Sequence, residues 1–93
     1  MLVFNVTFKC RPGMRDEFLE KLIGEGICAA CRGEEGNLKY DYYAAVDGDD
    51  LLLIEKWRDL SALMKHARQP HMARMDELKA EYTTDMILEK YEA

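Results

Sequence analysis

The sequence predicts an α+β fold of the ferredoxin-like type, in which helices cover one face of a four-stranded antiparallel sheet. Its 93 residues, 48% of them hydrophobic, suffice for a single domain over residues 1–93 with one core. Apolar residues recur at strand spacing near both ends of the chain and in its middle, and at helical spacing in the two segments between. The resulting order, β-α-β-β-α-β, is the split βαβ arrangement.

The first half is expected to contain one helix and three strands. Residues 2–10 alternate apolar and polar side chains, and Arg11-Pro12-Gly13 ends this strand. Residues 14–31 carry an apolar stripe at helical spacing, which predicts one amphipathic helix weakened at Gly24 and Gly26. Residues 37–46 and 51–57 flank an Asp-Gly-Asp-Asp turn, so we expect a hairpin there.

The second half is expected to contain a helix pair and a last strand. Asp59 is a suitable N-cap for a helix from Leu60 to about Ala67, and Pro70 ends that helix and begins the next. On the second helix a stripe faces the core; its members are His71, Met75, Leu78 and Tyr82. Residues 83–91 supply the final strand.

The first strand also predicts self-association. One of its alternating sets is wholly apolar and consists of Leu2, Phe4, Val6 and Phe8. Because helices cover only one sheet face, we expect this set to lie on the other face, buried in a homodimer that packs sheet on sheet.

Composition excludes several classes of partner. Thirteen basic residues against eighteen acidic ones give a net charge of -5, which argues against nucleic-acid binding. The N-terminus lacks a signal-peptide pattern and no apolar run reaches membrane-spanning length, so we expect a cytoplasmic protein with no membrane contact.

We expect neither a metal nor an organic cofactor. Three cysteines do not support a disulfide framework. Cys28 and Cys31 have CxxC spacing and could join His66 and His71 in a zinc site, but thirty-four residues separate the two half-motifs, far beyond finger spacing. The glycine motifs of flavin, nicotinamide and P-loop proteins are absent.

The candidate site residues gather after the third strand. Trp57, the only tryptophan, closes that strand, and the only two histidines, His66 and His71, flank Pro70. His66 borders the apolar stripe of its helix, where it is either a general base or a histidine bonded to a helix end. Trp57 forms either an aromatic wall for a planar substrate or simple core, and for His71 we favour capping and packing over substrate contact.

Further candidates for substrate binding lie on the strands and the last helix. They are Tyr40, Tyr42, Asn5, Thr7 and Met75. Asn5 and Thr7 line a cleft only if their face is the one that the helices cover, and Met75 is otherwise pliable core. Glu55 faces the same way as Trp57 and is a candidate second acid.

Taken in order along nearly the whole chain, these motifs resemble the antibiotic biosynthesis monooxygenase (ABM) family of dimeric α+β barrels. The matching segments are Arg11-Pro12-Gly13, Glu34-Glu35-Gly36-Asn37-Leu38, Ile54-Glu55-Lys56-Trp57, His66 and Gln69-Pro70-His71-Met72. Within the family the chain is most similar to quinol monooxygenase-like proteins and to the isomerase of phosphorylated autoinducer-2. The haem-degrading pattern is not matched, because Asn5 is one residue out of register, His66 replaces a Trp and Asp76 falls near the haem-ligand position.

Three functions follow from this resemblance and the candidate residues. The first is a cofactor-independent monooxygenase of an aromatic or quinol-type molecule, with His66 as general base. The second is an isomerase of a small phosphorylated dicarbonyl, and the third a non-catalytic dimeric small-molecule-binding protein. The aromatic and aliphatic candidates, and the lack of an arginine pair or glycine-rich nest for a phosphate, favour the first.

Overall fold

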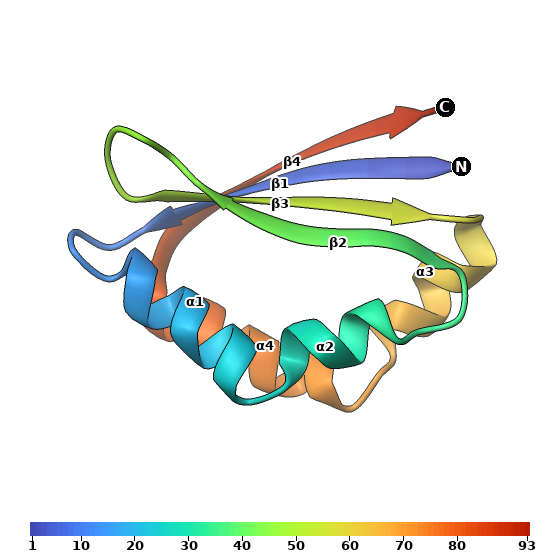
Figure 1. Cartoon of the computed structure of the whole chain (residues 1–93), viewed down its shortest axis with the longest axis horizontal. Helices are drawn as coiled ribbons and strands as arrows, with labels where there is room; N and C mark the ends of the chain where they lie inside the picture. The colour runs from blue at the N-terminus through green and yellow to red at the C-terminus, as the bar shows by residue number, and fades with distance from the viewer.

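Four antiparallel strands in the order β2-β3-β1-β4 form the sheet of the computed structural model, which describes residues 1–93 (Figure 1). The elements are β1 (Leu2–Cys10), α1 (Arg15–Gly24), α2 (Ile27–Arg32), β2 (Asn37–Ala44), β3 (Asp50–Trp57), α3 (Leu60–Ala67), α4 (His71–Tyr82) and β4 (Thr83–Glu92). The ferredoxin-like fold class predicted from the sequence is confirmed, as are the β2–β3 hairpin and the bounds of α3.

The first predicted helix is divided into two. The break falls after Gly24, where Gly26 adopts the left-handed backbone conformation at φ +78°. Glycine lacks the Cβ that makes this region costly for other residues, so the chain turns here and starts α2. The short α2 carries two buried thiols, Cys28 and Cys31.

The helices cover the apolar face of β1, so our assignment of that face to a dimer contact was wrong. Leu2, Phe4, Val6 and Phe8 are buried within the monomer. Phe8 packs edge-on against Phe18 of α1, with ring centroids 5.6 Å apart, and Phe18 stacks on Tyr82 of α4. The physical reason is that the wholly apolar set gains the most from leaving water, and the helices supply the nearest cover.

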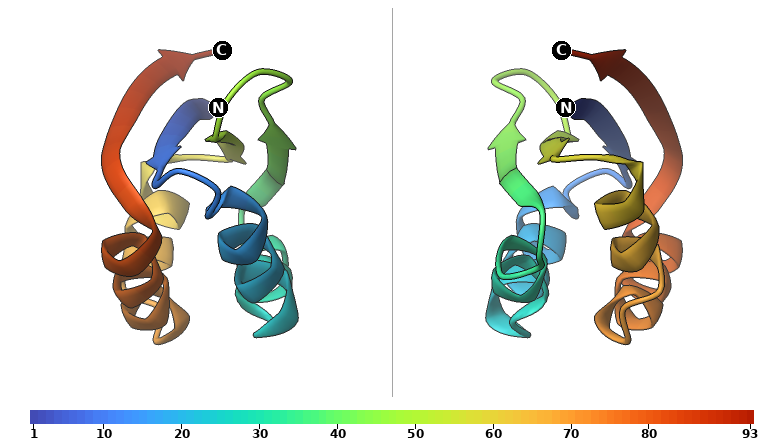
Figure 2. Two further views of the ribbon diagram at one scale, coloured as in Figure 1. Left: turned by 90° about the vertical axis from the view of Figure 1, so that its left-hand side faces the viewer. Right: turned by 90° about the vertical axis from the view of Figure 1, so that its right-hand side faces the viewer.

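The two helix pairs extend from the same face of the sheet, α1 with α2 on one side and α3 with α4 on the other (Figure 2). The longest of these helices, α4, has only 12 residues, and none is long and apolar enough to cross a bilayer.

The outer face of the sheet is partly exposed. It carries Val3, Asn5 and Thr7 of β1, and their partners across the sheet include Ile54 of β3 and Ile87 of β4. The edge strand β4 is exposed on both faces, since Met86 and Leu88 pair with the helix-facing residues of β1 and yet remain open to solvent.

Candidate active site

A buried histidine lies among aromatic rings between α3 and the sheet. His66 of α3 is 5% exposed, and its ring centroid is 4.5 Å from that of Trp57 at the end of β3. The ring of Tyr40 on β2 lies 5.8 Å away. The structure thus brings together three residues that the sequence analysis selected, but it packs Trp57 and Tyr40 fully into the core.

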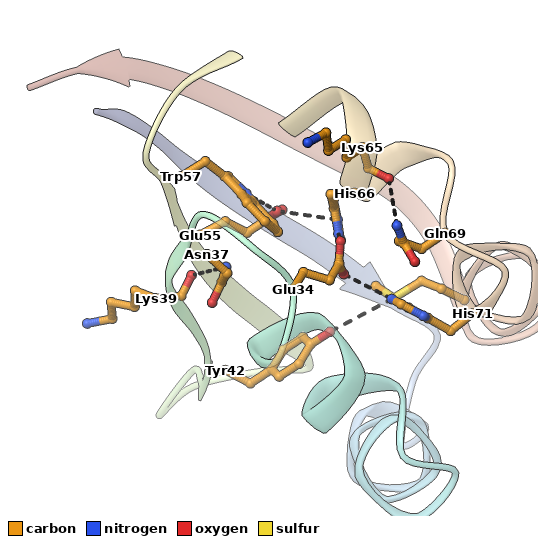
Figure 3. Close-up of polar contacts among 11 residues, drawn as sticks. Glu34, Asn37, Lys39, Tyr42, Glu55, Trp57, Lys65, His66, Gln69 and His71 are labelled. Atoms are coloured by element: carbon orange, nitrogen blue, oxygen red, sulfur yellow. Dashed lines mark hydrogen bonds and ion pairs between the residues drawn. The ribbon is translucent and has the colours of Figure 1, made fainter. Parts of the chain in front are cut away.

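A single carboxylate bridges the two histidines. Glu34, in the loop between α2 and β2, accepts a hydrogen bond from Nδ1 of His66 at 2.9 Å. The same oxygen, Oε2, accepts one from Nε2 of His71 at 3.0 Å (Figure 3). His71 therefore faces Glu34 at the first residue of α4, and is half-buried rather than core.

A second carboxylate lies on the other side of His66. Oε1 of Glu55 accepts a hydrogen bond from Nε1 of Trp57 at 3.0 Å and lies 3.7 Å from Nε2 of His66. Burial raises the pKa of the Glu55 carboxyl, while the Trp57 hydrogen bond and the adjacent His66 act in the opposite direction. His66 thus stands between two carboxylates, an arrangement suited to accepting and passing on a proton.

Local sequence features fix these positions. Gly36 has φ +82°, and its carbonyl accepts a hydrogen bond from the backbone N–H of Arg58, which ties the Glu34 loop to the end of β3. Asp59 caps α3 by accepting from the N–H of Ala62 at 2.9 Å. Pro70 precedes α4 and places His71 in its first turn.

A surface hollow of about 410 Å³ reaches this cluster from solvent. Its lining is mostly polar and consists of Ala30, Gly33, Glu34, Glu35, Lys65, Gln69 and His71. His66 and Trp57 do not line it, so Glu34 and His71 are the groups through which a small molecule would meet the cluster.

The other predicted site residues divide between the two faces of the sheet. Tyr42 and Met75 lie on the helix side, where the tyrosine hydroxyl is 4.0 Å from the methionine sulfur. Asn5 and Thr7 lie on the outer face, and the structure does not bring them to the cluster.

Sequence reasoning missed the central role of Glu34. In the sequence, Glu34 was noted only as part of the family-like segment Glu34-Glu35-Gly36-Asn37-Leu38. Its partner His66 lies 32 positions further along the chain. A glutamate before a left-handed glycine between a helix and a strand was the available signal, but it does not specify a partner.

Cys31 adds a thiol to the same cluster. One donor atom from each of Cys31, Glu34, His66 and His71 lies within 4.8 Å of all the others. Burial raises the pKa of the Cys31 thiol to about 12. Cys28, one helical turn earlier and also buried, is not in this set.

Fold and site together define a small ferredoxin-like α+β domain with a buried histidine–carboxylate cluster. The family model described as antibiotic biosynthesis monooxygenase matches residues 1–78. The chain belongs to this family, which confirms the resemblance noted from its motifs.

Individual relatives agree with this assignment. A Mycobacterium tuberculosis protein named "Putative monooxygenase Rv0793" is 34% identical over 64 residues, which span 69% of this chain and 61% of that relative. Its solved structure has a TM-score of 0.86, at 26% identity, over 99% of this chain and 93% of its own.

Two further solved structures have the same fold. A Pseudomonas aeruginosa protein, PA3566, has a TM-score of 0.86 at 25% identity, covering 99% of this chain and 92% of its own. A Nitrosomonas europaea protein reaches a TM-score of 0.89 over 100% of this chain and 98% of its own, and its 17% identity shows the fold alone.

Proposed function

We propose that this protein is a cofactor-independent monooxygenase that oxidises a small hydroxylated aromatic molecule of the quinol or phenol type. The observation that carries the proposal is the chain of polar groups from the hollow to the core, in which Glu34 bridges His71 and the buried His66. The family name and the name of the Mycobacterium relative support oxygen chemistry.

The residues have separate roles in this proposal. A substrate hydroxyl in the hollow meets Glu34 and His71, and Glu34 accepts the proton that it loses. His66, the base selected from the sequence, donates its Nδ1–H to this carboxylate and holds it in place. Glu55 lies 3.7 Å from the far nitrogen of His66 and helps to orient the ring so that its Nδ1–H faces Glu34. Lys65 and Gln69, which also line the hollow, supply donors for the oxyanion.

The chemistry after deprotonation needs only the substrate and O₂. Oxygen adds to an electron-rich ring carbon of the anion and gives a peroxide. This carbon carries one hydrogen. The O–O bond then breaks as that hydrogen is lost. One oxygen atom remains on carbon as a carbonyl, the other leaves as water, and the substrate supplies all four electrons.

The hollow also favours a second candidate. Six of its seven lining residues are not hydrophobic. Such a lining suits a small polar dicarbonyl better than the planar aromatic substrate for which Trp57 was selected as a wall. A carboxylate between two histidines can remove a proton from one carbon and return it to another, as an isomerase requires. The isomerase therefore remains the alternative, and a binding protein without activity is the third candidate.

Oxygen uptake with a panel of quinols and hydroxylated aromatics tests the proposal, beside an anaerobic isomerisation assay on phosphorylated diketones. We expect uptake above a protein-free control, slowed by roughly a hundredfold in Glu34→Gln. Glu35→Gln is the matched control, because Glu35 lines the same hollow but contacts Arg58 instead of the histidines. Diketone turnover without oxygen uptake would support the isomerase. No activity in either assay would support the binding protein.

We also propose that two copies pair through the outer face of the sheet. That face combines Val3, Leu52 and Ile54 with Ile87 of β4, a mixture of half-buried and exposed apolar side chains. Burying them against a second copy removes apolar surface from water, which the monomer leaves uncovered.

A further inference from the structure

We propose that Cys31, Glu34, His66 and His71 form a binding site for a zinc-like transition-metal dication. This site goes beyond the proposed function and does not depend on it. The two half-motifs lie far apart along the chain, and this spacing by itself argued against a metal. The fold brings their donor atoms within 4.8 Å of one another.

The distances suit tetrahedral coordination. Zinc bonds to nitrogen and oxygen of about 2.0–2.2 Å place neighbouring ligand atoms about 3.3 Å apart in a tetrahedron. Oε2 of Glu34 lies 2.9 Å from Nδ1 of His66 and 3.0 Å from Nε2 of His71, so small outward movements make room for an ion. The side chains of His66 and Glu34 are only 6% and 9% exposed, which limits their freedom to turn away.

The donor set selects the class of ion. One sulfur, two imidazole nitrogens and one carboxylate oxygen match the ligands of zinc and related ions, whereas magnesium and calcium prefer oxygen alone. A thiolate and a carboxylate together carry two negative charges, which neutralise a dication in a buried place. The hollow at Glu34 and His71 supplies an entry path from solvent.

An outer shell is already present around His66. Metal-bound histidines usually donate their other N–H to a carboxylate or carbonyl. The nitrogen of His66 that faces away from the donor set, Nε2, lies 3.7 Å from Glu55, whose carboxylate is held in turn by the indole of Trp57. A bound ion would occupy the groups proposed to accept the substrate proton, so metal loading should inhibit that reaction.

Metal titration of the purified full chain tests the site after treatment with a chelator. We expect one Zn²⁺ per chain, measured against a chromophoric competitor, and a Co²⁺ complex with thiolate charge-transfer absorption. Cys31→Ser should abolish that absorption and weaken Zn²⁺ binding by about a hundredfold or more, since even outer-shell partners contribute about 10–100-fold. Cys28→Ser is the matched control and should bind as the wild type does, because Cys28 is a buried thiol outside the cluster.

His71→Gln provides a second variant if Cys31→Ser fails to fold, because the His71 side chain is 20% exposed and less disruptive to replace. It should weaken binding similarly and keep native circular dichroism. Absence of stoichiometric Zn²⁺ binding, or binding that is equal in wild type, Cys31→Ser and His71→Gln, would overturn the proposal. These measurements do not use enzyme activity. A negative result would therefore reject the metal site without contradicting the proposed reaction.

Discussion

Gly36 holds the loop that carries Glu34 to the histidines. Its left-handed backbone lets the chain turn between α2 and β2, and its carbonyl is fixed by the N–H of Arg58. A Cβ at this position would lie 2.5 Å from Cβ of Ala62 on α3. One glycine therefore sets both the turn and the spacing between the Glu34 loop and the helix that bears His66.

We predict that Gly36→Ala lowers the free energy of unfolding by about 2–4 kcal/mol, through left-handed strain and the clash with Ala62 together. Gly48→Ala is the control: Gly48 has φ +85°, but open space surrounds its Cβ position, so only strain of about 1–2 kcal/mol applies. Urea unfolding measures the loss of stability in both variants. Equal losses in the two variants would contradict the packing role of Gly36.

At the scale of elements, α3 depends on the residue that caps its N-terminus, Asp59. The helix has eight residues, too few to be stable alone, and its Asp59 cap accepts a hydrogen bond from Ala62. Since α3 carries His66 over Trp57, the cap supports the site as well as the helix.

Asp59→Ala should destabilise the protein by about 1 kcal/mol, because the N–H of Ala62 loses its acceptor. Asp59→Asn keeps a capping oxygen and should cost much less. The comparison is made by urea unfolding, with the indole of Trp57 as the fluorescent reporter. An asparagine variant as unstable as the alanine one would show that the charge of Asp59, not its cap, matters.

For the whole molecule, the outer face of the sheet is a surface that the helices leave uncovered. Its apolar residues lie on three strands, and the edge strand β4 exposes side chains on both faces. A single helix layer cannot cover both sides of the sheet, which is the physical basis of the proposed homodimer.

Placing a charge on this face should therefore separate the two copies. Ile54 is paired with Asn5 and Asp41 in the middle of the sheet, so Ile54→Lys should give monomers in a sedimentation experiment in which the wild type forms dimers. Ile23→Lys is the control, because Ile23 is 59% exposed on α1, away from the outer face. A wild-type chain that sediments as a monomer at micromolar concentration would refute the proposed dimer.

The sequence by itself determined the four strands, the second helix pair and their order along the chain, but not the break that divides the first predicted helix into α1 and α2. Strand and helix periodicity follow from local spacing, so β1, the hairpin and α3 could be placed without a structure, and Asp59 and Pro70 marked the starts of α3 and α4. The family could also be recognised from the sequence, because its short motifs keep their order along the chain.

Only the tertiary structure decided which face the helices cover and how the site is built. Alternation along β1 defines two faces but does not say which one meets Phe18. The bridge from Glu34 to both histidines, and the arrival of Cys31 beside them, join positions up to 40 residues apart. Such contacts depend on how the helices pack against the sheet. This packing is a property of the assembled core and cannot be predicted from the spacing of residues along the chain.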